Sequence, residues 1–359
     1  DFNDSDNKII YQGNIWDGKS VSTKDLFLTR VNADGSYGWT HVILPGIVDS
    51  IYDVPVNFEK GKLGDKILSK LDIKPKTKEA NLKNWKRFVA KSKDVTEEIN
   101  IAIVGKYFDT GDFMLSDAYI SVIEAIKHAS FSLGRKPKIS WLSAVDFEKG
   151  GARLKKLSKF DGVLVPGGFG EQGIEGKLNV IRYARENKIP YFGICYGMQL
   201  LVIEFARNVL NLKDANTAEI NSDAEDVVID IMPDQKKKLE KNDYGGSMRL
   251  GGYPAVLKED SIAGKAYGVS EVLERHRHRY EVNPEYIESI EKGGLVFSGK
   301  SPDGKLMEIV ELPKDEHPFF LGTQFHPEFQ SRPLSPHSIF LEFIKAARTR
   351  HVQIEGKKK

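Results

Sequence analysis

Apolar runs alternate with segments of helical spacing from residue 99 onward. Residues 99–104 form a fully apolar run that ends at Gly105, and residues 117–129 carry apolar side chains at helical spacing. Continuous apolar strands between helices are typical of a parallel sheet that helices cover on both faces. The alternation predicts strands at 139–142, 162–165, 189–194, 227–232, 255–257, 295–298, 306–311 and 319–325, and helices at 178–186, 198–207 and 338–347. We therefore predict an α/β domain over residues 98–350, followed by a basic tail at 351–359.

The first 47 residues have a different pattern, in which glycines separate short strand-like segments. Strands are predicted at 25–31 and 37–44. The segment 25–39 resembles one unit of a β-propeller-type repeat. Because a single repeat cannot bury its own apolar face, we expect residues 1–47 to be a fragment, a graft onto a neighbour, or poorly ordered.

Residues 48–97 are rich in lysine and contain one short amphipathic pattern, at 82–89, that predicts a helix. The segment also holds Tyr52 and Trp85, which would be exposed in an isolated chain. We interpret residues 48–97 as a linker that docks on another surface.

The composition narrows the class of protein. With 40% hydrophobic residues the chain can bury a full core, and a net charge of +2 favours neither a nucleic-acid partner nor an anionic membrane. The apolar runs are far shorter than the roughly 20 residues of a membrane helix, and the acidic residues 1–6 are unlike a secretory signal. A single cysteine allows no internal disulfide and no cysteine-based metal cluster, so we expect no metal site and a cytoplasmic location.

The only cysteine lies in the sequence Gly193-Ile194-Cys195-Tyr196-Gly197, where a predicted strand ends and a predicted helix begins. This is the nucleophile-elbow pattern with cysteine in place of serine. The elbow needs small residues two positions on either side, because larger side chains would collide in so sharp a turn. The N-terminus of the following helix favours a thiolate. A lone cysteine is more often a buried small hydrophobe, but this setting indicates a nucleophile.

A cysteine nucleophile needs a base, because a thiol is only slightly ionised at neutral pH. Among eight histidines, His326 stands out: it follows a predicted strand, and Glu328 lies two residues on, where it can orient the imidazole. The alternative for His326 is a solvated loop histidine. His276 and His278 better fit a binding or structural cluster. The others have no companion carboxylate in a comparable register: His41, His128, His317, His337 and His351.

An oxyanion also needs hydrogen-bond donors. The sequence Pro166-Gly167-Gly168 follows another predicted strand, so it is expected at the same carboxyl edge of the sheet. Glycine lets the backbone amides approach an oxyanion closely. We predict that the amides of Gly167 and Tyr196 form an oxyanion hole.

Three motifs, Pro-Gly-Gly, Gly-x-Cys-x-Gly and His-Pro-Glu, resemble in this order the class I (triad) glutamine amidotransferases. That family has a flavodoxin-like, mostly parallel sheet and hydrolyses glutamine through a γ-glutamyl thioester, releasing ammonia. Further segments resemble CTP synthase in particular, and the resemblance spans residues 48 to about 347. They are residues 48–55, 104–107, 119–129, 165–177, 246–251, 274–283 and 324–333.

The resemblance implies a catalytic triad of Cys195, His326 and Glu328. It also implies that glutamine is held by Gly168, Phe169, Tyr196, Gly197, Met198, Gln199, Glu219, Arg279 and Tyr280. The chemistry agrees, because a carboxylate suits the ammonium of free glutamine and a guanidinium suits its carboxylate. The glutaminase itself needs no cofactor, and the family suggests a homo-oligomer.

Two features differ from the CTP synthase pattern. No glycine-rich phosphate loop occurs, so ATP, Mg²⁺ and UTP are expected to act only with a synthetase domain that this sequence does not contain. Gln172 stands where the family commonly has arginine, so activation by GTP is in doubt. The expected function is glutamine hydrolysis that supplies ammonia for amination of UTP to CTP. The alternatives are a non-catalytic or regulatory remnant, or another triad amidotransferase or amidase.

Overall fold

The computed structural model describes four short strand segments before residue 45 and most of the chain after it. The described residues are 9–11, 14–16, 26–31, 37–44, 50–74, 81–105, 119–168, 170–231 and 248–356. The chain divides into two units, Asp1–Asp94 and Val95–Lys359. The division falls near residue 98, one of the predicted boundaries, whereas the predicted boundary at residue 48 lies inside the first unit.

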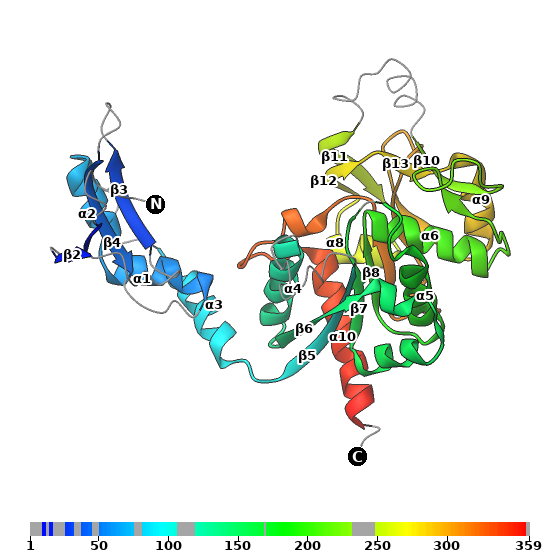
Figure 1. Cartoon of the computed structure of the whole chain (residues 1–359), viewed down its shortest axis with the longest axis horizontal. Coiled ribbons are helices and arrows are strands. Elements are labelled where there is room, and N and C mark those ends of the chain that lie inside the picture. Colours follow the sequence, from blue (N-terminus) through cyan, green and yellow to red (C-terminus); the bar gives the residue numbers. More distant parts are fainter. Residues whose placement is uncertain are drawn as a thin grey trace. The chain divides into compact units, whose positions relative to one another are not determined.

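A nine-stranded sheet forms the centre of the second unit (Figure 1). Its strand order is β12-β11-β14-β15-β16-β8-β7-β5-β6. The five strands from β16 to β6 pair in parallel, and the strands from β12 to β16 pair antiparallel. The bounds are β5 Glu98–Gly105, β6 Lys136–Ser143, β7 Gly162–Val165, β8 Tyr191–Ile194, β11 Arg249–Leu257, β12 Glu271–His278, β14 Val296–Lys300, β15 Met307–Glu311 and β16 Phe320–Thr323.

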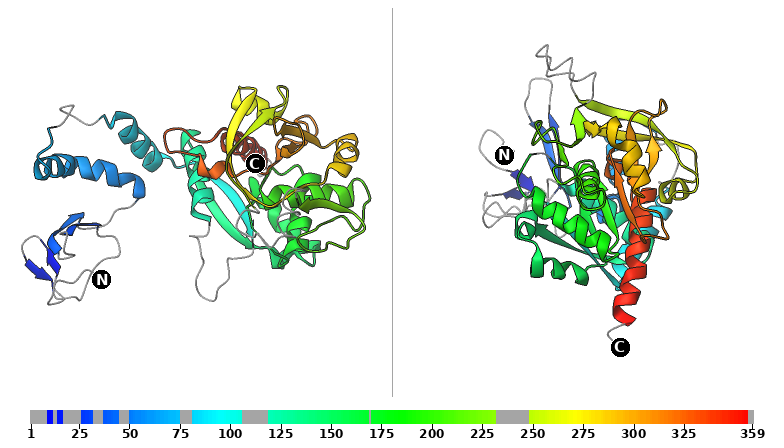
Figure 2. Two further views of the ribbon diagram at one scale, coloured as in Figure 1. Left: turned by 90° about the horizontal axis from the view of Figure 1, so that it is seen from above. Right: turned by 90° about the vertical axis from the view of Figure 1, so that its right-hand side faces the viewer.

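Helices cover both faces of this sheet because its central strands are apolar on both sides. All four residues of β7 and of β8 are buried. Side chains of α5 and α6 form one hydrophobic core, and side chains of α4, α8 and α10 form the other. Figure 2 shows α10, in red, as a long helix. The bounds are α4 Ile120–Ser132, α5 Ile174–Glu186, α6 Tyr196–Asn208, α8 Ile262–Tyr267, α9 Pro284–Lys292 and α10 Ser338–Gly356.

Smaller elements complete the second unit. A three-stranded sheet has the order β13-β10-β9, with β9 Asn216–Thr217, β10 Val227–Ile231 and β13 Tyr280–Val282. Short 3₁₀ helices span Ala144–Phe147, Gly151–Lys159 and Pro327–Phe329. In the described part of the chain, no helix combines the length and the apolar character that crossing a membrane requires.

The first unit contains two antiparallel strand pairs, β1 with β2 and β3 with β4. The predicted strands at 25–31 and 37–44 correspond to β3 and β4, and most other residues before position 50 lie outside the described ones. The bounds are β1 Ile9–Tyr11, β2 Asn14–Trp16, β3 Leu26–Val31, β4 Tyr37–Leu44, α1 Val54–Lys60, α2 Leu63–Lys70 and α3 Lys83–Asp94, with a 3₁₀ turn at Ile51–Asp53.

The aromatic residues of the predicted linker pack against one another. The Tyr52 and Phe88 rings lie 5.0 Å apart, and the Trp85 Nε1–H donates to the carbonyl of Tyr52 at 2.8 Å. This packing buries Tyr52 and Phe88 within the first unit. Trp85 is half-buried, and docking of residues 48–97 on another surface stays a prediction.

Several described elements, among them α1, α2, α8, α9 and β13, were not predicted. For two other differences the contacts or the pattern give a reason. Residues 271–278, which were left without an element, form strand β12, and their pattern explains it: Arg275 and Arg277 are exposed while His276 and His278 are buried. The predicted tail is helical as far as Gly356. Helix α10 extends because Arg350 donates to the carbonyl of Phe160 at 3.1 Å and His351 Nδ1 lies 2.9 Å from Asp161.

Candidate active site

Cys195 lies between β8 and α6 in a strained turn. Its φ and ψ angles are 52° and −99°, a backbone conformation that non-glycine residues rarely adopt. The glycines on either side are required by close packing. A Cβ on Gly197 would lie 2.2 Å from the carbonyl oxygen of Val165, and a Cβ on Gly193 would lie 2.6 Å from the backbone of Gly197. The sequence requirement for small residues at both positions thus has a direct steric cause.

His326 follows β16, one strand away from the cysteine. Its backbone N–H donates to the carbonyl of Arg275 at 2.8 Å, which ties it to strand β12. Its Nδ1 lies 2.7 Å from Oε1 of Glu328, and its ring stacks on Phe329 with the ring centroids 5.2 Å apart. Because a carboxylate accepts the Nδ1–H, the proton-exchanging nitrogen of the neutral ring is Nε2.

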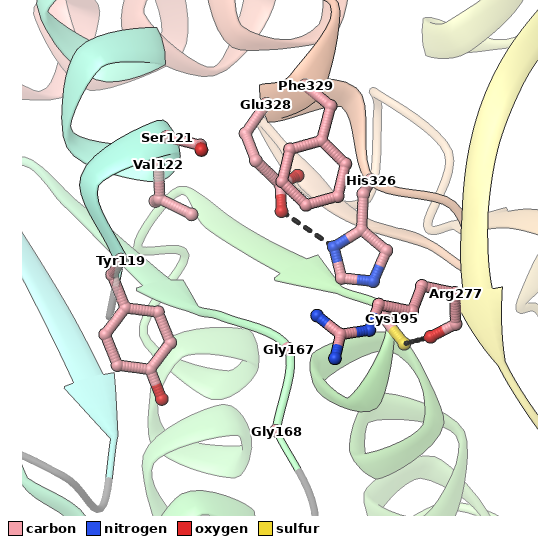
Figure 3. Close-up of a pocket in the computed structure, with 10 residues that line it drawn as sticks. All are labelled: Tyr119, Ser121, Val122, Gly167, Gly168, Cys195, Arg277, His326, Glu328 and Phe329. Carbon is pink, nitrogen blue, oxygen red and sulfur yellow. Dashed lines mark hydrogen bonds and ion pairs between the residues drawn. The ribbon is translucent and has the colours of Figure 1, made fainter. Parts of the chain in front are cut away.

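The imidazole and the thiol meet beside Gly167 (Figure 3). A Cβ on Gly167 would lie 2.9 Å from Cε1 of His326 and 3.7 Å from the Cβ of Cys195, so both side chains reach the same small volume. Among the described residues, the buried Nε2 of His326 has no hydrogen-bond partner. A nitrogen left free on the side of the thiol is what a base needs to take up a proton and return it.

The electrostatic surroundings favour a charged imidazole. Burial by itself lowers the pKa of His326, but the Glu328 carboxylate and Cys195 outweigh it, so the pKa of His326 rises to about 10. At neutral pH the ring is then protonated, which stabilises a negative charge on Sγ and supplies a proton for a leaving group.

These residues line a cavity of about 220 Å³ at the carboxyl edge of the parallel strands. Sequence reasoning assigned no role to half of the lining residues. The cavity is lined by Gly167, Gly168, Cys195, His326 and Glu328, together with Tyr119, Ser121, Val122, Arg277 and Phe329 (Figure 3). Arg277 lies on the exposed face of β12, and its period-2 alternation with two buried histidines is the signal that could have placed it on a strand beside the site.

Two of the residues expected to bind glutamine contact Gly170. The Glu219 carboxylate accepts from the amide of Gly170 at 3.0 Å, and the Tyr196 hydroxyl donates to the carbonyl of Gly170 at 3.3 Å. Burial and the Glu219 carboxylate raise the pKa of the Tyr280 hydroxyl, and the Arg279 guanidinium opposes this rise. Glu219 and Arg279 thus both act on Tyr280, and a carboxylate and a guanidinium match the two charged ends of a free amino acid.

Other expected binding residues are placed differently. Met198 is fully buried and would touch a Cβ on Gly322, so its side chain belongs to the core. Gly197 packs on the backbone of Val165. For these two residues only the backbone is available to a ligand. Gln199 is 3% exposed and bonds to other residues of the site, and Phe169 lies outside the described residues.

A buried ionic cluster lies beneath strand β12. The Arg249 guanidinium is 2.7 Å from Glu308 and 3.5 Å from Glu281, and His278 Nε2 is 2.6 Å from Glu281. Burial and Arg249 lower the pKa of His276 and of His278, so both rings are neutral. The two histidines thus form the structural cluster that we predicted as one of two options. Within the described residues, no group of three or more His, Cys, Asp or Glu side chains could hold a metal ion.

This cluster should make stability depend on pH. Burial and the neighbouring Glu281 carboxylate raise the pKa of Glu308, and Arg249, which contacts both carboxylates, offsets this rise only in part. The folded state therefore holds a proton that the unfolded state loses, and stability falls as pH rises through the raised pKa. We expect the urea unfolding free energy to drop between about pH 6 and about pH 9 by at least roughly 1 kcal/mol more in the wild type than in Glu308→Gln. If the unfolding free energies of the two proteins changed equally with pH, the folded state would not hold the extra proton on Glu308.

Comparison with known proteins agrees with this geometry. The model of the family "Glutamine amidotransferase class-I" matches residues 114–346. The CTP synthases of Methanococcus aeolicus and Methanocaldococcus jannaschii are 47% and 48% identical over 303 residues, which is 83% of this chain and 54% of each relative. The chain thus spans about half the length of the curated relatives it matches. The solved glutaminase domain of Trypanosoma brucei CTPS with bound acivicin is 39% identical, with a TM-score of 0.64 over 70% of this chain and 94% of that one.

The mixed sheet with a Cys-His-Glu constellation at its carboxyl edge, together with the matched family, makes this chain a member of the class-I glutamine amidotransferases. Within that family, its likeness to the trypanosomal domain places it with the glutaminase domains of CTP synthase. The predicted fold class and the family resemblance are both confirmed.

Proposed function

We propose that this chain hydrolyses L-glutamine to glutamate and ammonia, with Cys195, His326 and Glu328 as its catalytic triad. The observation that supports this most is the convergence of the thiol and the carboxylate-bound imidazole beside Gly167, at the edge of a cavity. A cysteine that served only as core packing would need neither the strained elbow nor a histidine whose second nitrogen is left free.

In the first half of the reaction, the Cys195 thiolate attacks the carboxamide carbon of glutamine. A C–S bond forms, and the carbonyl π electrons move to the oxygen. Tyr196 is the first residue of α6, and the first amides of a helix have no partner within it, so the Tyr196 amide is available to the oxyanion together with that of Gly167. Collapse of the intermediate expels ammonia, which takes its proton from the His326 imidazolium.

The second half releases glutamate. His326, now neutral, takes a proton from water while the water oxygen attacks the thioester carbon. The second tetrahedral intermediate then breaks its C–S bond, which returns the thiolate and leaves the imidazole protonated. Glu328 keeps its bond to Nδ1 throughout and so orients the ring and stabilises its charge.

The ammonia is proposed to serve the ATP-dependent amination of UTP to CTP in a synthetase partner, as domain or separate chain. ATP, Mg²⁺ and UTP belong to that partner, whereas the glutaminase half needs no cofactor. GTP activation remains in doubt because Gln172, an exposed residue before α5, offers no cation to a phosphate. A homo-oligomer and a cytoplasmic location remain predictions.

The proposal is tested by measuring ammonia release from L-glutamine by the purified chain, alone and with a separately produced synthetase domain of CTP synthase. We expect a low rate alone that rises when the synthetase domain is added. Absence of turnover under both conditions would favour the non-catalytic alternative, whereas turnover of other amides in preference to glutamine would favour an amidase.

A substitution at Gly167 tests the geometry of the cavity. A Cβ at Gly167 would press on Cε1 of His326 at 2.9 Å, while a Cβ at Gly168 would meet nothing closer than 4.0 Å. We expect Gly167→Ala to lower kcat by about 10- to 100-fold, because the imidazole must move away from the thiol. Gly168→Ala is the matched variant and should lose clearly less. Equal losses in the two variants would show that the steric argument is wrong.

A further inference from the structure

Gln324 is a buried residue beside the nucleophile that the proposed mechanism leaves without a role. It directly follows β16, its side chain is fully buried, and its Nε2 lies 3.7 Å from Sγ of Cys195. Sulfur is large, so its hydrogen bonds are longer than those of oxygen. The thiol also faces the charged imidazole of His326 beside Gly167, and Sγ can donate to the carbonyl of Arg277 at 3.9 Å. That acceptor is compatible only with the protonated thiol, whereas a donor favours the thiolate.

The neighbours of Gln324 decide which end of its carboxamide faces the sulfur. A carboxamide can rotate and exchange its oxygen and nitrogen, so the direction must come from the other bonds. Nε2 of Gln199 donates to the backbone carbonyl of Tyr280 at 2.9 Å, and a carbonyl oxygen can only accept. The same Nε2 lies 3.2 Å from Oε1 of Gln324, which takes its second hydrogen. With its oxygen committed to Gln199, Gln324 must present its NH₂ group to Cys195.

We infer that Gln324 is a positioning residue that donates a hydrogen bond to the Cys195 thiolate, and that Gln199 sets the direction of this bond. The bond is charge-assisted only when the sulfur is ionised, so it favours the reactive form of the nucleophile. The inference rests on the proposed function for the role of Cys195, but the bond itself can be measured without glutamine. It also gives Gln199 a part in the site that is separate from substrate contact.

Iodoacetamide reacts with the thiolate, so the alkylation rate reports how readily the thiol ionises. Because Cys195 is the only cysteine, a single mass adduct reports its reaction. We expect Gln324→Met, which keeps the size and removes the donor, to slow alkylation about three- to tenfold at neutral pH. At about pH 10.5, well above the ordinary pKa of a cysteine thiol, the two rates should converge. Gln324→Glu, which replaces the donor with an acceptor of the same shape, should be slowed at least as much. If Gln324→Met does not fold, the alkylation rate of Gln324→Glu tests the inference in its place.

Gln330→Met is the matched control. Gln330 also follows β16, and it donates to the carbonyl of Leu273 and to Glu274, both on β12. Neither of these bonds involves the sulfur. Its alkylation profile should stay within twofold of the wild type. The inference is overturned if Gln324→Met alkylates as fast as the wild type at neutral pH, if it is slowed equally at every pH, or if the control is slowed as much. If the alkylation rate depends on Gln324 but the chain does not hydrolyse glutamine, the proposed function is disproved and the inference about Gln324 stands.

Discussion

Cys195→Ala should abolish glutamine hydrolysis, with a loss of at least about 10⁴-fold in kcat, because no other side chain of the site can form the thioester. The fold should survive, since Cys195 is a small buried residue and alanine removes a single sulfur atom. Ammonia release and thermal unfolding of the same preparations measure both effects. We expect the unfolding temperature to change by only a few degrees.

A Cys195→Ala protein that remains folded and still turns over would refute the assignment of the nucleophile. A protein that fails to fold would leave the loss of activity without meaning. In that case Cys195→Ser, which replaces sulfur by the smaller oxygen, provides the same test with less change in packing.

His326→Ala should lower kcat by about 10³- to 10⁵-fold, because it removes both the proton donor for ammonia and the cation beside the thiolate. The pH dependence should change as well: the raised pKa of His326 keeps the imidazolium present at neutral and mildly alkaline pH, and the variant loses this ionisation. Ammonia release measured across the pH range reports both effects.

His351→Ala is the matched control for this variant. His351 also pairs with a carboxylate, Asp161 at 2.9 Å, but on helix α10 and outside the lining of the cavity. We expect it to keep the activity of the wild type. If both histidine variants lost activity to the same degree, the loss would reflect folding and not catalysis.

The α/β domain could be predicted because its signals are local. The apolar runs of β5, β7 and β8 and the helical spacing of α4 and α6 are each contained in one segment of the sequence. Strand β12 was missed because arginine and histidine do not look like strand residues, although their alternation has the period of a strand. The extension of α10 depends on contacts of His351 and Arg350 with residues some 190 positions away, which no local pattern reveals.

The candidate site likewise has a part that local motifs predict and a part that they do not. The elbow around Cys195 and the pair His326 and Glu328 have compact motifs, so sequence alone could bring them together as a hypothesis. Arg277 and Phe329 lie in segments that resemble CTP synthase, but the local sequence assigned them no role, and they reach the cavity through the pairing of strands and the turn after β16. The companion carboxylate of His337 is likewise distant in sequence, since Glu274 at 2.9 Å comes from β12.

The most direct test of the account is covalent labelling of the wild-type chain with an electrophilic glutamine analogue, followed by intact-mass and peptide analysis. We predict a single adduct on Cys195 that forms more slowly when L-glutamine is added and does not form in Cys195→Ala. An unlabelled chain, or an adduct on Cys195 whose formation L-glutamine does not slow, would contradict the claim that this thiol attacks glutamine.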